Sequence, residues 1–499
     1  MDNPVFTDDT ELKKDDVRKR TNRLPNGDTD GDIKPETVKL KKHVGLVGGT
    51  SFIVGTIIGS GIFISPKGVL SETGSVGLSL IVWVGAGLLA LMGSLCYAEL
   101  GTLIRKSGGE YQYIKQCFGN IPAFMYAWTS VIVIRPSSMA IICLTFGEYV
   151  ATFFPYCGNP DLPMKLVAAL AIMTLAIINC ADTRLATHVQ VFFTVAKLVA
   201  LLIISIGGIV RMAQGDIKEL QRGFEGTTNS PSTIALAFYD ALWAYDGWNN
   251  LNYLTEEIEN PKKNLPRANI AGVLLVTVVY LLTNISYLTA MTSAELLASD
   301  AVAVTWGDRV LGSAAILMPL SVLFSTFGSA NGTLFSGGRV VYVAARDGML
   351  PEMLSYVNCK RYTPVPSIIF TSIISIAMII PGNLSDLIDF FSFTAWIFYG
   401  VTVSSLIVCR FTMKDAERVF KVPLPIPILF VLLSLYLIIG PIIQSPRIEF
   451  LYAFLFIIGG LIFYVPLVYF KLNIPFWGKI STFSQLFFES VPSPYIPDE

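Results

Sequence analysis

Residues 55–63 read Gly55-Thr56-Ile57-Ile58-Gly59-Ser60-Gly61-Ile62-Phe63, and their three glycines lie near the centre of a long apolar segment. Glycine costs about 1 kcal/mol relative to alanine in a helix interior, so this stretch is a poor continuous helix. Small residues also allow neighbouring membrane helices to pack closely. Packing motifs usually space their glycines one helical turn apart, however, so the Gly59-Ser60-Gly61 triplet favours a helix that unwinds and exposes backbone groups to a ligand.

Apolar segments of similar length recur along the whole chain. Of its 499 residues, 53% are hydrophobic and only 15% are charged, whereas soluble domains are about one quarter charged. About twelve segments are long enough to cross ~30 Å of hydrocarbon. They begin near residues 44, 77, 121, 165, 189, 233, 269, 312, 366, 384, 424 and 449. The pattern predicts an all-α membrane protein with about twelve transmembrane helices and no separate soluble domain.

The two ends of the chain differ from this apolar body. Residues 1–43 are rich in Asp, Lys and Arg and contain no apolar core, so we expect a disordered cytoplasmic tail rather than a signal peptide. Residues 44–472 form the predicted twelve-helix membrane domain. Residues 473–499 form a second tail, which holds either a short amphipathic helix at residues 479–489 or a frayed end. Lys and Arg cluster in alternate loops, which predicts that both termini are cytoplasmic.

A second irregular segment lies in the sixth apolar block. Residues 241–248 read Ala241-Leu242-Trp243-Ala244-Tyr245-Asp246-Gly247-Trp248 within an apolar run from about residue 234 to residue 254. A carboxylate at mid-membrane costs roughly 2.5–3.5 kcal/mol on insertion scales and rarely lacks a partner. The neighbouring sequence supplies no fixed cation for Asp246. A substrate with a positively charged side chain would supply one.

The two irregular segments are separated by five spans. Five is an odd number, so the second half of the domain enters the membrane in the opposite direction. This predicts inverted repeats over about residues 44–211 and 233–410, followed by two further helices. Paired breaks in such halves indicate a transporter binding site near the midplane. Half-helix N-termini attract a carboxylate and the opposite ends attract an ammonium group, which suits an α-amino acid.

Two basic residues also fall inside apolar segments, Lys197 in the fifth and Arg135 in the third. Long basic side chains can extend to the membrane surface. Lys197 lies roughly two helical turns from the end of its segment, which favours a fixed ammonium group in the place of a sodium ion. The sequence assigns no role to Arg135.

The seven cysteines do not indicate an intrachain disulfide framework. Six fall in predicted spans or cytoplasmic segments: Cys96, Cys117, Cys143, Cys180, Cys359 and Cys409. Only Cys157 lies in a predicted outside loop. A single thiol in an oxidising compartment suggests an intermolecular disulfide, and an unpaired surface thiol is equally compatible with the topology.

Several of these motifs resemble those of a known family. Residues 59–63 resemble the signature of the amino acid–polyamine–organocation superfamily. Residues 255–266, which include Thr255-Glu256-Glu257 and Asn264-Leu265-Pro266, resemble the light subunits of heteromeric amino acid transporters, and so do residues 324–332 and 362–366. The similarity runs from about residue 44 to residue 475.

Residues 242–249 narrow the resemblance to family members that exchange dibasic amino acids and cystine for neutral amino acids. Other light subunits carry a small neutral residue in the place of Asp246. The resemblance implies broken first and sixth helices in a core of two inverted five-helix repeats. It also implies a substrate site made of Ile57, Ile58, Ser60, Gly61, Ile62, Trp243, Ala244, Tyr245 and Asp246.

The resemblance also implies individual roles within that site. The unwound segment would hold the α-carboxylate and ammonium groups, Trp243 would be an aromatic gate, Tyr245 would shape the site, and Asp246 would receive the cationic side chain. Lys197 would replace a sodium ion. Cys157 would form a disulfide with a single-pass glycoprotein heavy chain.

We therefore expect a sodium-independent antiporter that exchanges extracellular cationic amino acids and cystine for intracellular neutral amino acids. The expected location is the plasma membrane, on the apical face in an epithelium. Alternatives are a large-neutral or cationic/neutral exchanger of the same family, and a proton-coupled symporter, because a membrane carboxylate can relay protons.

Other function classes fit the sequence less well. A channel needs a continuous polar lining rather than two discrete breaks. An enzyme needs a catalytic cluster, but the two histidines, His43 and His188, lie far apart and no Walker or His-Glu-x-x-His motif occurs. We expect no cofactor, no metal and no nucleic-acid partner; besides the substrates and the heavy chain, the expected partner is the lipid bilayer.

Overall fold

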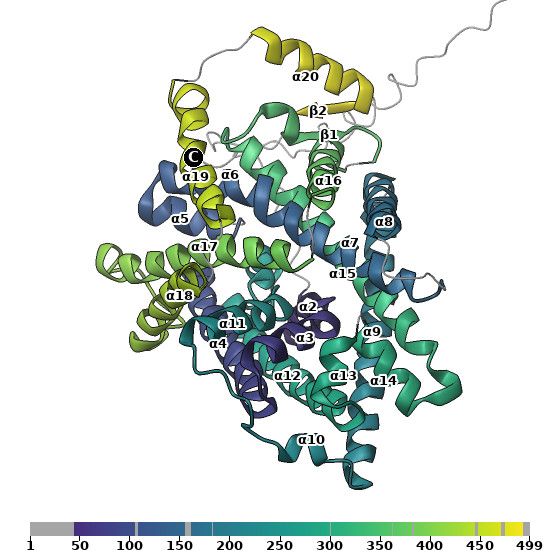
Figure 1. Ribbon diagram of the computed structural model, residues 1–499. Coiled ribbons are helices and arrows are strands. Elements are labelled where there is room, and N and C mark those ends of the chain that lie inside the picture. Colours follow the sequence, from purple (N-terminus) through teal and green to yellow (C-terminus); the bar gives the residue numbers. More distant parts are fainter. Residues whose placement is uncertain are drawn as a thin grey trace, which may run out of the picture. The chain divides into compact units, whose positions relative to one another are not determined.

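The computed structural model is almost entirely helical (Figure 1). The residues that it describes are 44–104, 108–154, 161–181, 183–299, 301–361, 363–381, 384–444, 448–470 and 475–492. They belong to one compact unit, residues 42–499.

The first half of the chain contains α2 (Leu46–Ile57), α3 (Gly61–Thr73), α4 (Val76–Leu103), α5 (Glu110–Phe118), α6 (Asn120–Thr129), the π-helix η1 (Ser130–Ile134), α7 (Arg135–Ala151), α8 (Asp161–Ala181), α9 (Thr183–Ala213), α10 (Lys218–Gln221), α11 (Pro231–Ala244) and the 3₁₀-helix η2 (Asn250–Glu257). The second half contains α12 (Pro261–Ala290), α13 (Ser293–Ala298), α14 (Val302–Val310), η3 (Gly312–Ala314), α15 (Leu317–Arg346), η4 (Glu352–Ser355), β1 (Tyr356–Asn358), α16 (Val365–Ile379), α17 (Leu384–Thr412), α18 (Pro425–Gln444), α19 (Ile448–Tyr464), the π-helix η5 (Val465–Tyr469), α20 (Pro475–Phe488) and β2 (Ser490–Pro492).

Within the described residues, nine helices are long and apolar enough to cross a membrane. The bent pair α2 and α3, whose axes differ by 54°, makes ten if it counts as one span. Helices α11 and α16, with 14 and 15 residues, are shorter than a full span. The helical membrane fold is confirmed, whereas the number of twelve spans and the inverted repeat stay predictions.

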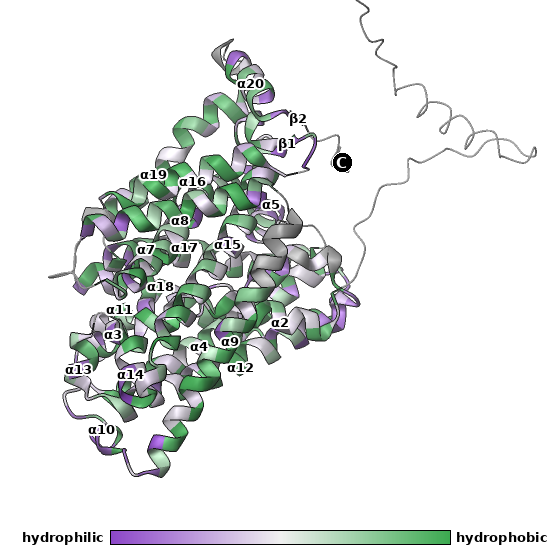
Figure 2. Cartoon of the chain, turned by 90° about the vertical axis from the view of Figure 1, so that its right-hand side faces the viewer, coloured by the Kyte–Doolittle hydropathy of each residue, from purple (hydrophilic) through white to green (hydrophobic). Residues whose placement is uncertain are grey.

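The outer helices expose large apolar side chains. On α8, Leu166, Leu170 and Ile177 are 61%, 59% and 69% exposed. Figure 2 shows that hydrophobic residues predominate along the helices in view. A soluble protein rarely exposes apolar patches of this extent, so these faces are suited to contact with hydrocarbon.

One buried carboxylate on α4 forms hydrogen bonds with residues at the end of α17 and shortly after it. Glu99 is completely buried and accepts hydrogen bonds from Arg410 at 2.6 Å and Arg418 at 3.1 Å. The backbone N–H of Val422 also donates to it, at 2.7 Å. A carboxylate out of water needs partners of this kind, because an unpaired buried charge is strongly destabilising.

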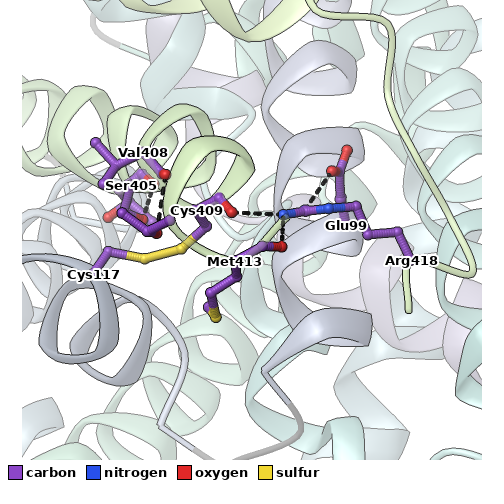
Figure 3. The surroundings of a disulfide bond; sticks show 9 residues. Glu99, Cys117, Ser405, Val408, Cys409, Met413 and Arg418 are labelled. Atoms are coloured by element: carbon purple, nitrogen blue, oxygen red, sulfur yellow. Dashed lines mark hydrogen bonds and ion pairs between the residues drawn. A yellow bond between two sulfur atoms is a disulfide. The ribbon is translucent and has the colours of Figure 1, made fainter. Parts of the chain in front are cut away.

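A disulfide between Cys117 and Cys409 lies beside this cluster and joins α5 to α17 (Figure 3). Arg418 donates to the carbonyls of Cys409 and Met413. The expectation that no intrachain pair forms is therefore wrong for these two residues. That expectation rested on the compartment of each cysteine, whereas two segments 292 residues apart meet here only in three dimensions.

The C-terminal segment folds back onto the loop before α16. Strand β2 pairs antiparallel with β1, with Val357 opposite Val491. Lys360 and Glu489 form an ion pair at 2.7 Å at the end of this ladder. Helix α20 directly precedes β2, so this part of the C-terminal tail is structured.

We predict that Glu99→Gln lowers the free energy of unfolding by about 3–5 kcal/mol, because two arginines then lose their buried carboxylate. Thermal unfolding in detergent measures the effect. Glu225→Gln is the control, because Glu225 pairs with Arg222 at an exposed position and its loss leaves the midpoint unchanged. Equal midpoints for wild type and Glu99→Gln would contradict the prediction.

Candidate functional site

The first helix break separates α2 from α3. Ile58 follows the last residue of α2 with an extended backbone, φ −69° and ψ 102°, and α3 begins at Gly61. The N–H groups of Gly61 and Ile62, the first two of α3, have no intrahelical acceptor, as at any helix N-terminus, whereas that of Phe63 donates to the carbonyl oxygen of Ser60 at 3.0 Å. Ile57, Ile58, Ser60 and Ile62 are all buried, so these amides lie in a region with little water.

The second break follows α11 and lies against the first. Gly247 has a φ of +105°, a conformation that side-chain-bearing residues rarely adopt, and η2 begins three residues later. The Thr56 hydroxyl contacts the carbonyl of Gly247 at 3.4 Å. A Cβ atom at Gly61 would lie 2.3 Å from the Cα of Ala244, so only glycine allows α3 and α11 this close. The structure thus brings the two predicted breaks together.

One tyrosine joins the ends of both half-helices. The hydroxyl of Tyr280, on α12, lies 3.1 Å from the carbonyl oxygen of Ile57 and 2.9 Å from that of Ala244. These are the last carbonyls of α2 and α11, where the negative ends of two helix dipoles meet. Sequence reasoning missed Tyr280; its one signal is a hydroxyl at the centre of an apolar segment.

Lys197 approaches the same region from α9. Its side chain is completely buried, and its ammonium group donates to the carbonyl oxygen of Gly55 at 2.5 Å. The charge therefore lies near the C-terminal end of α2, where a cation is favourable.

Asp246 has a fixed partner that the sequence did not reveal. The Tyr399 hydroxyl, on α17, donates to its Oδ1 at 3.0 Å. Asp246 and Arg135 also line the same cavity, of about 20 Å³. The hydrogen-bond donor of Asp246 therefore comes from a helix distant in sequence, and the expectation that the neighbouring sequence supplies no fixed cation stays a prediction.

Arg135 belongs to a hydrogen-bonded cluster that lines this cavity. Its Nη2 donates to the Tyr253 hydroxyl at 2.8 Å, and that hydroxyl donates to Glu110 at 2.5 Å. Asn249 donates to the other oxygen of Glu110. Asn249 and Tyr253 directly follow the second helix break, so the cluster attaches that segment to α5.

Trp243 and Tyr245 point to different neighbours. Trp243 packs edge-on against Phe391 of α17, with ring centroids 4.9 Å apart. The Tyr245 hydroxyl donates to the carbonyl oxygen of Trp83 on α4 at 3.1 Å. Tyr245 therefore contributes its backbone to the break and its side chain to helix packing. Cys157 lies outside the described residues.

A second, larger cavity has a volume of about 650 Å³. Its lining includes Asp240 of α11 and Ile388 of α17, one turn before Trp243 and Phe391 respectively. The small cavity includes Asp246 and Ala395, about one turn after them. Along α11 and α17, the Trp243–Phe391 contact therefore lies between residues that line the two cavities.

We predict that Tyr280→Phe lowers the free energy of unfolding by about 1–3 kcal/mol, because two buried carbonyls lose their common donor. Tyr287→Phe is the matched control. Tyr287 lies on the same helix and is equally buried, and its hydroxyl has no hydrogen-bond partner within the described part of the chain. Thermal unfolding of both variants in detergent tests the prediction, and a loss as large in Tyr287→Phe would refute it.

Comparison with known proteins supplies a family. A family model described as amino acid permease matches residues 44–468. The "b(0,+)-type amino acid transporter 1" of Mus musculus is 54% identical over 469 residues, which are 93% of this chain and 96% of the relative. The human "Large neutral amino acids transporter small subunit 2" is 44% identical over 86% of this chain and 82% of its own length. The human "Cystine/glutamate transporter" is 43% identical over 85% of each chain. This chain, with its apolar helices and paired breaks, is thus a multi-pass membrane transporter that belongs to the amino acid permease family.

Proposed function

We propose that this protein is a sodium-independent antiporter that exchanges extracellular cationic amino acids and cystine for intracellular neutral amino acids by alternating access. The observation that carries this proposal is the carboxylate of Asp246, which lies at a helix break beside a second break. The b(0,+)-type name of the relatives with 51–54% identity supports the same assignment.

The α-amino acid part of the substrate binds between the two breaks in this proposal. Its carboxylate faces the N–H groups at the start of α3, where the helix dipole is positive. Its ammonium group faces the carbonyl oxygens of Ile57 and Ala244, both of which also lie within hydrogen-bond distance of the Tyr280 hydroxyl. Ile58, Ser60, Gly61 and Ile62 form the walls of this part.

The side chain of the substrate extends towards Asp246. A cationic side chain there adds a charge-assisted hydrogen bond, which contributes about 1.5–3 kcal/mol. Trp243 lies between residues that line the two cavities and acts as the gate, and its ring adds cation–π attraction as a basic side chain passes. Tyr245 holds the backbone of the break through its contact with α4.

Lys197 provides the charge that a sodium ion supplies in coupled carriers. Its ammonium group already donates to Gly55 near the end of α2. Without sodium, the driving forces are the membrane potential and the gradient of the neutral amino acid. A unit charge that enters a negative interior gains about 2.3 kcal/mol per 100 mV, which favours uptake of cationic substrates.

The proposal extends to the partner and the location. Cys157 forms a disulfide with a single-pass glycoprotein heavy chain, and the complex lies in the plasma membrane, on the apical face in an epithelium, with both termini cytoplasmic. The support is the resemblance to light subunits and the position of Cys157 in a predicted outside loop.

We predict that Asp246→Asn lowers arginine uptake about tenfold and retains leucine exchange, because only the cationic side chain needs the carboxylate. The measurement is uptake into proteoliposomes loaded with leucine, with leucine uptake as the internal control.

Replacing sodium by choline leaves uptake unchanged. Empty vesicles take up little arginine even with a pH gradient, whereas a proton symporter would respond to that gradient. Unchanged arginine uptake in Asp246→Asn would contradict the proposal.

We predict that Cys157→Ser removes a covalent complex that is visible on non-reducing gels of native membranes. The heavy chain then migrates separately, because no thiol remains to form the bond. Cys359→Ser is the control, because Cys359 is an exposed free cysteine on another loop. A complex that persists in Cys157→Ser shows that another residue makes the bond.

A further inference from the structure

The proposed substrates differ in charge, and the site must accept both kinds. Three side chains of the acidic and basic types, those of Asp246, Arg135 and Glu110, line the small cavity. With all three ionised, their charges sum to −1. A cationic substrate side chain brings the sum to 0, and a neutral one leaves it at −1. A buried carboxylate without a compensating charge is unfavourable, so the neutral case needs an explanation.

Among the described residues, Glu110 accepts more side-chain hydrogen bonds than Asp246 does. Tyr253 donates to it at 2.5 Å, Tyr126 at 3.3 Å, and Asn249 donates to its second oxygen. Asp246, in contrast, accepts one side-chain hydrogen bond, from Tyr399, among the described residues. A carboxylate offers about four acceptor positions, so Asp246 retains capacity for a further donor.

The guanidinium group of Arg135 has an unused hydrogen-bond donor within the described residues. A guanidinium group has five N–H donors. Of these, Nη2 donates to Tyr253, and the buried Nε has no hydrogen-bond partner within the described residues. The cavity between Arg135 and Asp246 has a volume of about 20 Å³, which is room for about one water molecule. Arg135 and Asp246 therefore share one small cavity, and each keeps unused hydrogen-bonding capacity within the described residues.

The backbone places Arg135 at this cavity. The π-helix η1 ends at Ile134, immediately before Arg135, and π-turns of this kind occur frequently at functional sites. The guanidinium also lies 5.5 Å from the centre of the Tyr253 ring. Arg135 is thus hydrogen-bonded to Tyr253 and lines the same cavity as Asp246.

We propose that Arg135 is the resident counter-ion of Asp246. It pairs with the carboxylate when a neutral amino acid occupies the site, and it withdraws to Tyr253 and Glu110 when a cationic side chain arrives. One site thereby presents a compensated carboxylate to either kind of substrate. Arg135 acts through Asp246 and does not itself contact the substrate. The inference rests on the proposed role of Asp246 as acceptor of the substrate side chain.

The test compares the KM values for leucine and arginine in proteoliposomes. Arg135→Gln leaves two carboxylates with a charge sum of −2, so we expect the KM for leucine to rise about tenfold. The KM for arginine changes by less than about threefold, because the substrate supplies its own cation. Arg135→Lys keeps the charge and retains a KM for leucine near that of wild type. This variant also controls for folding.

The double variant Arg135→Gln/Asp246→Asn is the decisive arm. Its charge sum is again −1, so we expect the KM for leucine to return to within about threefold of wild type. Three results would each overturn the inference: equal loss of leucine and arginine transport in Arg135→Gln, the same loss in Arg135→Lys, or no rescue in the double variant. Failure of the proposed function is read separately, from arginine uptake in the single variant Asp246→Asn.

Discussion

The hydrocarbon core of a membrane offers no water to unpaired backbone groups, and this constraint governs the centre of the molecule. Helices satisfy their own N–H and C=O groups, so every break needs substitutes. Two breaks lie side by side here, and the Tyr280 hydroxyl contacts the last carbonyls of both half-helices. Lys197 binds a third carbonyl, that of Gly55. The first two N–H groups of α3 have no intrahelical acceptor, as at any helix N-terminus.

The buried carboxylates show two different solutions to the cost of burial. Glu99 accepts hydrogen bonds from two arginines and one backbone N–H, and all of these partners are fixed. Such a cluster fastens helices together. Asp246 accepts a side-chain hydrogen bond from Tyr399 and lines a cavity that Arg135 also lines. An incompletely satisfied carboxylate of this kind is suited to bind and release a charged group.

The fold was largely predictable from the chain alone. Apolar segments of membrane length, the alternation of basic loops and the glycine-rich break at Gly59-Ser60-Gly61 all follow from local composition. The break at Asp246-Gly247 and the buried ammonium of Lys197 were also visible as polar residues in apolar runs. The disulfide between Cys117 and Cys409 was not visible, because the sequence shows the compartment of a cysteine and not its distance from another one.

The sequence by itself determined which residues are out of place in hydrocarbon, since the energetic cost of a charge or a glycine depends on the local segment. Only the tertiary structure decided how those residues are satisfied. Tyr280, Tyr399 and Glu110 come from helices far from the two breaks in sequence, and their hydrogen bonds depend on helix packing. The partners of Asp246 and Arg135 therefore appear only when α5, α7, α11 and α17 are placed together, because hydrogen bonds act over distances of about 3 Å that no sequence pattern specifies.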